Sequence, residues 1–470
     1  MMHKQLETHV KDIQTLTIDD LVPTDHLVRK LAKIDLSFIY DLVEPLYAKN
    51  GPESIDPIVL FKILIIQHVF GISSMRQTIK EIQVNIAYRW YLGFNLTDSI
   101  PHFTTFGKNY ERKFKKNQIY NEIFHQILLL IKSQGFIDEE SVFIDGTHIA
   151  ANANKNKSQN KKVEVPNHPY HDIIETAVNE NRKINNQKEL KQTKKKEYKN
   201  IKVSTTDPDS GWFHKGDHKE RFAYTVNTCC DKNAFVLDFV VTEGNIHDST
   251  SFKPLYEKIK MNNNIKNVVA DSAYKTPCIA KDIIDSNKIP IFPYKNSKSN
   301  KNLFHKNQFI YDKETNTFTC PNDCILKYST TNRDGYIIYK SNKNDCINCP
   351  LAKQCTNSET GIRIISQHVF FNYMNKVEEY QIIYHDIYME RSKKIERVFA
   401  NAKENHNLRF TKLKGIQKVT DEITFKFLCL NLKKLVNRMD KMNKNIIDSI
   451  SITLVYFTNI CNFENYYQFI

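Results

Sequence analysis

Apolar residues recur with helical spacing in the first third of the chain, and residues 15–135 are expected to form short helices joined by short turns. Capping residues and glycines mark the expected helix ends: Asp56 with Pro57, Gly71, Ser74, Gly93 and Gly135. The last helix is expected to run from Phe106 to about Ser133, with Thr104 or Thr105 as its cap. This arrangement suits a helix-turn-helix reader of DNA and an ordinary helical bundle about equally.

From residue 141 onward the pattern changes to short apolar runs that are typical of strands. The expected strands are 141–151, 221–229, 234–242, 267–270 and 289–293, with a helix after the third and another after the fourth. This succession predicts an α/β fold of the ribonuclease H-like kind, a mixed sheet flanked by helices. In such a sheet the first and fourth strands are neighbours. Helices return at about 377–406 and 419–440.

Two stretches interrupt this pattern. Residues 155–202 are rich in Lys, Asn and Gln and are interpreted as a mobile basic excursion, with a helix over 173–190. Residues 295–375 contain a cluster of cysteines. The expected organisation is a helical DNA-binding domain (1–135), the first part of an α/β core (136–294), a cysteine-rich insertion (295–375), the C-terminal helices of the core (376–440) and an unassigned tail (441–470).

Three carboxylates lie in segments that can each place an acid at a metal site. Asp145 and Asp271 end strands that are expected to be neighbours, and Glu396 lies on a helix. Glu396 stands at the edge of that helix's apolar stripe, about 100° from its middle. Together the three acids could hold two Mg²⁺ ions for phosphodiester chemistry. Each acid taken alone is more often a turn, a cap or a surface charge.

Five of the ten cysteines fall between Cys320 and Cys355. Cys346 and Cys349 have the C-x₂-C spacing of a thiolate zinc site, with Cys320 and Cys355 as the expected remaining ligands and Cys324 as a spare. A structural Zn²⁺ would stabilise a lobe that has few apolar residues to bury. The alternative is a set of reduced cysteines in an irregular loop. The scatter of the other cysteines favours a reducing cytosol over a secreted, disulfide-bonded protein.

The charge of the chain favours an anionic partner. Its formal net charge is +14, and nucleic acid is the expected partner, although AT-rich codon usage contributes to the lysine content. The cations of the N-terminal helices expected to contact DNA are Arg76, Lys80, Arg89, Lys108 and Arg112. No signal peptide and no apolar run long enough for a membrane span are found in the sequence, so a cytoplasmic protein is expected.

Three further polar residues, two histidines and an aspartate, are interpreted as structural. His148 follows Asp145 by three positions, and His247 follows a predicted strand. Both histidines are expected to be structural, not to hydrogen-bond the ligands of a metal. Asp248 is expected to be the N-cap of the next helix.

The chain resembles the DDE transposases of bacterial insertion sequences, in the branch with a cysteine-bearing insertion. The resemblance covers about residues 15–440 and is carried by segments 21–29, 54–61, 70–77, 88–90, 145–154, 204–209, 244–249, 271–277 and 395–404. It implies that Asp145, Asp271 and Glu396 form a triad that uses Mg²⁺ or Mn²⁺. It also implies that the N-terminal helices bind terminal inverted repeats, and that a homodimer acts on target DNA in the bacterial nucleoid.

The glutamate helix departs from the family's Tyr-x₂-Arg-x₃-Glu-x₆-Lys pattern. Lys403 fits the pattern and is expected to hold a phosphate, but Arg391 and Glu396 are separated by one residue too many. On a regular helix Arg391 is expected to point about 140° away from Glu396. Lys393 or Arg397 would then replace it, or the helix would bulge. A zinc-stapled repressor with an inactive core and a hydrolytic nuclease remain alternative functions.

Overall fold

The computed structural model describes residues 15–48, 50, 54–191, 198–215, 219–294 and 303–443. The chain forms two compact units. Of the described residues, the helical unit contains 15–137, 399–410 and 417–443, and the sheet unit contains 138–398 and 411–416. From residue 444 onward, the tail left unassigned by the sequence pattern lies outside the described residues.

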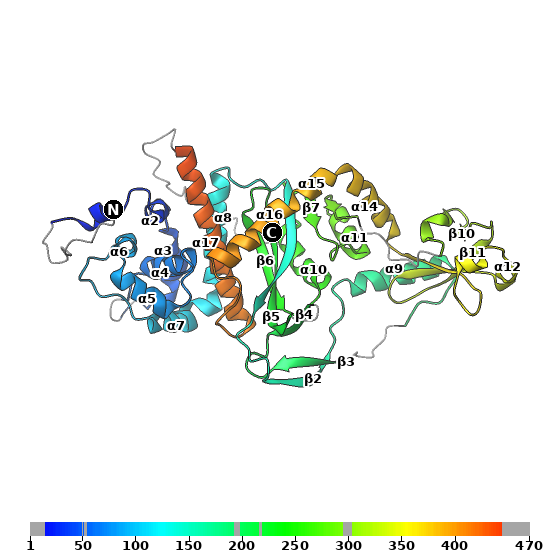
Figure 1. Cartoon of the computed structure of the whole chain (residues 1–470), viewed down its shortest axis with the longest axis horizontal. Helices are drawn as coiled ribbons and strands as arrows, with labels where there is room; N and C mark the ends of the chain where they lie inside the picture. The colour runs from blue at the N-terminus through cyan, green and yellow to red at the C-terminus, as the bar shows by residue number, and fades with distance from the viewer. Residues whose placement is uncertain are drawn as a thin grey trace, which may run out of the picture. The chain divides into compact units, whose positions relative to one another are not determined.

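Short helices form the first part of the helical unit (Figure 1). They are α1 (Ile18–Leu21), α2 (Leu27–Leu31), α3 (Phe38–Val43), α4 (Pro57–Val69), α5 (Met75–Val84), α6 (Ile86–Leu92), α7 (Thr104–Asn109) and α8 (Ile119–Ser133). The predicted caps of α4 and α5 are confirmed, because the side chains of Asp56 and Ser74 accept hydrogen bonds from backbone N–H groups of the first turn. Gly93 ends α6 in the left-handed conformation, with φ of 77°.

The single helix predicted over 106–133 is wrong. The chain leaves α7 through a π-helical turn (Tyr110–Phe114) and a 3₁₀ turn (Lys115–Asn117), and it breaks at Gln118, which has φ of 49°. The break allows Phe114 and Tyr120 to pack on the ring of Phe61, with centroids 5.4 and 6.1 Å away. Tertiary packing of these rings therefore overrides the local helical pattern.

Helix α17 (Ile416–Asn443) completes the core of the helical unit. Phe425 stacks on Phe61 with ring centroids 6.0 Å apart, and it is 3% exposed. The hydroxyl of Tyr110 donates a hydrogen bond to Asp421 at 2.5 Å. A helix from the far end of the sequence thus belongs to the same core as α4.

The main sheet of the sheet unit has the strand order β6-β5-β1-β7-β8. Its strands are β1 (Ser141–Ala150), β5 (Lys219–Cys230), β6 (Val236–Glu243), β7 (Asn267–Ala270) and β8 (Ile289–Ile291). Strand β5 alone runs opposite to the others. The predicted pairing of the first and fourth strands is confirmed, since β1 and β7 are parallel neighbours with Ile144 opposite Ala270.

Helices α10 (Asp248–Ile259), α11 (Pro277–Asp285) and α14 (Phe371–Ile383) pack on this sheet (Figure 1). Their apolar residues share one buried cluster with β1 and β7, which includes Val142, Ile144, Phe252, Ile279 and Val377. Parallel strands buried in this way need apolar residues at consecutive positions, which explains the short apolar runs in the sequence.

The basic excursion predicted over 155–202 contains regular elements. They are β2 (Ser158–Glu164), α9 (His171–Ile184) and β3 (Tyr198–Ser204), and β4 (Gly211–Lys215) follows. Strands β2 and β3 form an antiparallel ribbon that extends from β5 through β4 (Figure 1). Arg182 of α9 donates hydrogen bonds to Thr330 and to the carbonyl of Thr331 at 2.9 Å. The excursion is therefore tied to the insertion.

The insertion contains an antiparallel sheet with the order β13-β12-β11-β10-β9. Its strands are β9 (Ile310–Asp312), β10 (Thr317–Thr319), β11 (Ile325–Thr331), β12 (Tyr336–Ser341) and β13 (Ile364–His368). Between the last two strands lie the short helices α12 (Lys343–Ile347) and α13 (Ala352–Cys355). A small core of Phe309, Phe318, Leu326, Tyr339 and Ile365 supports the sheet. The sequence pattern did not predict these strands.

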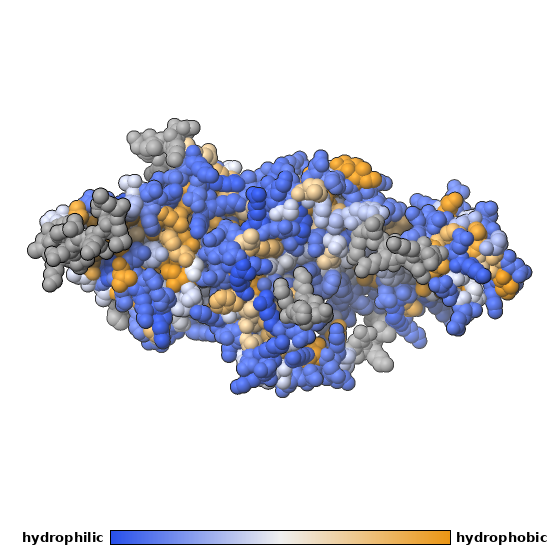
Figure 2. Space-filling model, viewed as in Figure 1, coloured by the Kyte–Doolittle hydropathy of each residue, from blue (hydrophilic) through white to orange (hydrophobic). Residues whose placement is uncertain are grey.

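The helix predicted over 377–406 is divided into α14, α15 (His385–Met389) and α16 (Arg391–Asn405). The apolar stripe predicted on α16 is confirmed, because Ile395, Val398, Phe399 and Ala402 are all buried. Within the described ranges no helix is long and apolar enough to cross a membrane. The face of the molecule in Figure 2 is mostly hydrophilic, with its hydrophobic residues in separate small patches.

Candidate active site

Asp145 and Asp271 lie side by side at one end of the main sheet. The residues before them, Ile144 and Ala270, are register partners in the parallel pair of β1 and β7. Asp145 is still within β1, whereas Asp271 follows the last residue of β7. Parallel strands carry the chain in one direction, so the two acids emerge at the same end of the sheet.

Helix α16 adds an arginine and a glutamate to this pair. The Nη2 atom of Arg391 lies 2.6 Å from Oδ2 of Asp145, and its Nη1 atom lies 3.5 Å from Oε1 of Glu396. The prediction that Arg391 points away from Glu396 is therefore wrong. Arg391 is the first residue of α16, and its long side chain, 12% exposed, reaches both acids. Lys393 and Arg397, the predicted substitutes, are exposed.

The surroundings of Asp145 disfavour its charged form. Burial is the main cause that raises the pKa of Asp145, to about 6, against the lowering effects of Arg391 and of a hydrogen bond from the Gly146 backbone. The charges of Asp271 and Asp248 raise the pKa of Asp145 further. The site therefore gathers negative charge in a partly buried place, and a cation would relieve this repulsion.

The segment that follows α16 is hydrogen-bonded to the sheet unit at Thr411 and Gly415. The N–H of Thr411 donates to the carbonyl of Ala150, the last residue of β1, at 3.0 Å. The buried carboxylate of Asp207 accepts hydrogen bonds from the N–H of Gly415 and from the hydroxyl of Tyr224. These bonds give a structural role to the 204–209 segment, for which the sequence alone indicated none.

Two histidines were expected to be structural, and the expectation is confirmed for His247. The ring of His148 stacks on Phe213 at 3.7 Å between centroids. His247 is the N-cap of α10, because its side chain accepts a hydrogen bond from the N–H of Ser249. The prediction that Asp248 is this cap is wrong. The extended backbone that a cap requires occurs at His247, and Asp248 is already the first helical residue.

Lys393 and Lys403 were the other cations predicted beside the acids. Lys393 is exposed on the first turn of α16. Lys403 lies in the part of α16 that belongs to the helical unit, and its Nζ atom is 6.0 Å from the centre of the Phe399 ring. Phosphate binding by these lysines stays a prediction.

One of the cations predicted to contact DNA is buried. Arg89 is 7% exposed, and its guanidinium donates hydrogen bonds to the carbonyls of Gln83, Asn95 and Asp98. The prediction of an exposed Arg89 is therefore wrong, because three backbone carbonyls need its donors. The other predicted cations of the helical unit are exposed, namely Arg76, Lys80, Lys108 and Arg112.

The cysteines of the insertion gather around one cavity of about 20 Å³, lined by Cys320, Cys324, Cys346, Cys349 and Cys355. All five are free thiols. The N–H groups of Asn322 and Cys324 donate to the sulfur of Cys320 at 3.4 and 3.3 Å. Across the described part of the chain, no three Cys, His, Asp or Glu side chains are yet arranged as a metal site. Ligation by these thiols or by the acids would require side chains to turn inward.

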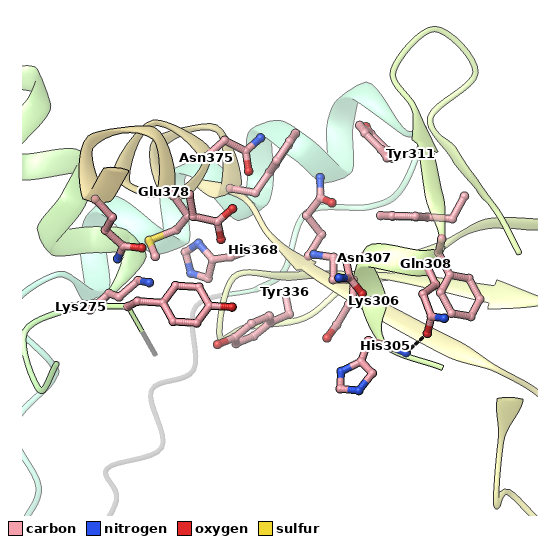
Figure 3. Close-up of a pocket in the computed structure, with 18 of the residues that line it drawn as sticks. Lys275, His305, Lys306, Asn307, Gln308, Tyr311, Tyr336, His368, Asn375 and Glu378 are labelled. Carbon is pink, nitrogen blue, oxygen red and sulfur yellow. Dashed lines mark hydrogen bonds between the residues drawn. The ribbon is translucent and has the colours of Figure 1, made fainter. Parts of the chain in front are cut away.

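An open groove of about 1830 Å³ lies between α14 and the insertion sheet (Figure 3). Lys275 and Glu378 line one wall, and Lys306 and His305 line the other, with His368 between them. The exposed rings of Tyr294 and Tyr336 also border the groove. Since Lys275 comes four residues after Asp271, at most about 14 Å of chain separates the groove from the acids.

Two family matches connect this architecture with known proteins. Residues 16–112 match a family described as "Transposase domain (DUF772)", and residues 319–436 match one described as "Transposase DDE domain". The second match includes Glu396 and most of the insertion, whereas Asp145 and Asp271 lie outside both. A search of the curated proteins and a search of the solved structures found no match. Together the two family matches support an insertion-sequence DDE transposase, and DNA as its partner.

Proposed function

We propose that this chain binds the terminal inverted repeats of an insertion sequence and catalyses metal-dependent DNA strand cleavage and strand transfer. The observation that carries the proposal is the ion pairing of Arg391 with both Asp145 and Glu396, at the end of the sheet where Asp271 lies next to Asp145. The strand order, with only β5 reversed, supports a ribonuclease H-like core. The helices before residue 135 would then serve as the DNA-binding domain.

The residues at the site fit Mg²⁺ or Mn²⁺. Carboxylate oxygens are the donors that these hard cations prefer. Burial raises the pKa of Asp145 to about 6, and a bound cation would stabilise its charged form. Asp145, Asp271 and Glu396 would hold the metal. Bound divalent ions would activate water or a DNA 3′-hydroxyl and stabilise the leaving oxygen.

Arg391 is the residue of the site that can change partners. Its guanidinium now neutralises Asp145 and Glu396. Once a cation neutralises these acids, the same guanidinium is available to a DNA phosphate, which it can bind through two parallel N–H groups. Asp145, whose side chain is 19% exposed, is already largely shielded from water, which strengthens its electrostatic interactions.

DNA contacts would involve both units. The exposed cations of the helical unit can pair with phosphates of the terminal repeats. The groove beside α14 suits a single DNA strand, because Tyr294 and Tyr336 can stack on bases while Lys275 and Lys306 pair with phosphates. A homodimer would allow both ends of the element to be bound.

The insertion would carry a structural zinc ion. Cys320, Cys346, Cys349 and Cys355 offer four thiolates around a cavity large enough for one small group. The N–H groups of Asn322 and Cys324 donate to the sulfur of Cys320 and help to hold it at the cavity. Turning the thiols inward would fill the cavity with the ion.

The decisive experiment incubates the full-length protein with labelled terminal-repeat DNA and Mg²⁺, and measures binding, cleavage and joining. Asp145→Asn and Asp271→Asn should bind the DNA as the unmodified protein does, but cleave it at least about 100-fold more slowly. Asp238→Asn is the control, because Asp238 lies on β6 and pairs with Lys258 of α10 instead of with a residue of the site. Cleavage without joining would identify a hydrolytic nuclease, and binding without cleavage would identify an inactive repressor.

A further inference from the structure

Gly146 brings strand β1 unusually close to the first turn of α10. A Cβ atom at this position would lie 2.9 Å from Oδ1 of Asp248, 3.1 Å from Oδ1 of Asn227 and 3.5 Å from the hydroxyl of Tyr274. Even the smallest side chain would displace the carboxylate, so only glycine permits this approach. The residue directly after Asp145 therefore lies against a fourth carboxylate.

The backbone before α10 fixes the position of Asp248. A Cβ atom at Gly244 would lie 2.6 Å from the carbonyl oxygen of Ala223, to which the N–H of Gly244 donates a hydrogen bond at 2.9 Å. The loop is thus pressed against β5. His247 then caps α10, so that Asp248 opens the helix directly over β1. The carboxylate is held there by the fold and not by a free loop.

Asp248 interacts electrostatically with two residues of the candidate site, because its charge raises the pKa values of Asp145 and Tyr274. Tyr274 is fully buried and donates a hydrogen bond to Oδ1 of Asn227 at 2.7 Å. Segments 145–154, 244–249 and 271–277, which lie far apart in the sequence, therefore meet at this point. Such a convergence of polar groups is typical of a functional site.

Asn227 provides an independent indication of a ligand. Its side chain is fully buried, and its Nδ2 atom has no hydrogen-bond partner in the described part of the structure. An unpaired buried donor costs roughly 1–3 kcal/mol, and native proteins rarely leave one unpaired unless a water or ligand completes it. Asn227 is the register partner of Gly146, and its side chain lies beside that glycine together with the carboxylate of Asp248.

We propose that Asp248 is a fourth carboxylate of the active site and binds the divalent cation together with Asp145 and Asp271. The Asn227 amide donates to an oxygen that accompanies this cation, either a bound water or a DNA phosphate. This inference rests on the proposed metal-dependent function. In this arrangement α10 contributes Asp248 to the site, and α16 contributes Arg391 and Glu396.

The test measures Mn²⁺ binding to the full-length protein by titration calorimetry without DNA. Asp248→Asn should weaken binding at least about tenfold, the effect expected when a partner of a metal site is lost. Asp172→Asn is the matched control, because Asp172 also lies in the first turn of a helix, α9, and should leave binding unchanged. Asp248→Ser keeps a residue favoured at helix starts while removing the charge, and it should reproduce the loss if the asparagine variant folds poorly.

The outcomes separate this inference from the proposed function. If Asp145→Asn abolishes Mn²⁺ binding while both folded Asp248 variants bind normally, the fourth carboxylate is refuted and the metal-dependent function stands. If the unmodified protein does not bind Mn²⁺, or if Asp145→Asn binds it equally well, both ideas fail. Weaker binding in the Asp248 and Asp145 variants, with the Asp172 control unchanged, supports the inference.

Discussion

Arg391 forms an ion pair with Asp145, with 2.6 Å between Nη2 and Oδ2, and it joins the first residue of α16 to strand β1. The same guanidinium reaches Glu396 at 3.5 Å. The helix that carries the glutamate is therefore held against the sheet by the charges that a bound cation would use. Binding of a metal and the position of Arg391 are consequently coupled.

Replacement of Arg391 by alanine should destabilise the metal-free protein. The change leaves the partly buried Asp145 without its cationic partner, and we expect a loss of roughly 1–3 kcal/mol in the free energy of unfolding, allowing for partial exposure to solvent. Urea unfolding measures this loss. Lys393→Ala, an exposed change two residues along α16, should alter the free energy of unfolding by less than about 0.5 kcal/mol. Equal effects of the two variants would show that the ion pair contributes nothing.

The stability of the metal-free protein should depend on pH through Asp145. Its pKa of about 6 in the folded state lies above the ordinary value of 3.8, so the folded protein binds this proton more tightly than the unfolded chain does. The stabilising contribution of this proton is complete below pH 3.8 and is lost as the pH rises through about 6. Thermal unfolding between pH 3.8 and 7 should show this decline, and Asp145→Asn should flatten it.

A divalent cation should reverse part of this pH dependence. The cation and the proton compete for Asp145, so Mn²⁺ should raise the melting temperature more at pH 7 than at pH 5. The Asp145→Asn variant serves as the control in the same titration. An Mn²⁺ effect that is the same at both pH values would place the cation away from Asp145.

The pair Asp145 and Asp271 could be predicted from sequence because both signals are local. Each acid ends a short apolar run, and the succession of strands makes those runs neighbours. The cap at Asp56 was predictable for the same reason, since a cap acts on its own first turn.

The roles of Arg391, Arg89 and Asp248 could not be predicted because they depend on contacts across the fold. Arg391 reaches its partners through side-chain torsions that a helical wheel ignores. Arg89 is buried where it donates hydrogen bonds to carbonyls of the loop after α6, and no sequence motif identifies that loop. Asp248 of α10 can approach β1 only because Gly146 makes room for it. In each case tertiary contacts outweigh the local pattern.

The cysteine cavity predicts zinc in the purified protein. Cys346→Ser and Cys349→Ser should each remove zinc, as measured by metal analysis, because three thiolates cannot complete a tetrahedral structural site. Cys324→Ser should keep zinc, since Cys324 is the spare thiol, and it controls for loss of a cysteine from the same cavity. If zinc persists in Cys349→Ser but disappears in Cys324→Ser, then Cys324 is a zinc ligand and Cys349 is the spare thiol. Absence of zinc from the unmodified protein would refute the site.

Helix α17 should be essential for the stability of the helical unit. Phe425 is buried against Phe61, so Phe425→Ala should lower the free energy of unfolding by about 3–5 kcal/mol. Phe410→Ala is the matched control, because Phe410 belongs to the same unit but is 44% exposed. Near-ultraviolet circular dichroism during urea unfolding measures both variants.

A fragment that ends at residue 137 would lack α17 altogether and should therefore show loosened tertiary packing. Weak DNA binding by such a fragment would reflect this defect as much as the location of the DNA site. The test of DNA recognition should instead use the full chain with Lys108→Ala and Arg112→Ala, whose side chains are exposed. Each change should weaken binding to terminal-repeat DNA. Each should also reduce the slope of the logarithm of the binding constant against the logarithm of salt concentration by about one, because one phosphate contact is lost. Normal binding and salt dependence in both variants would remove this surface from the DNA interface.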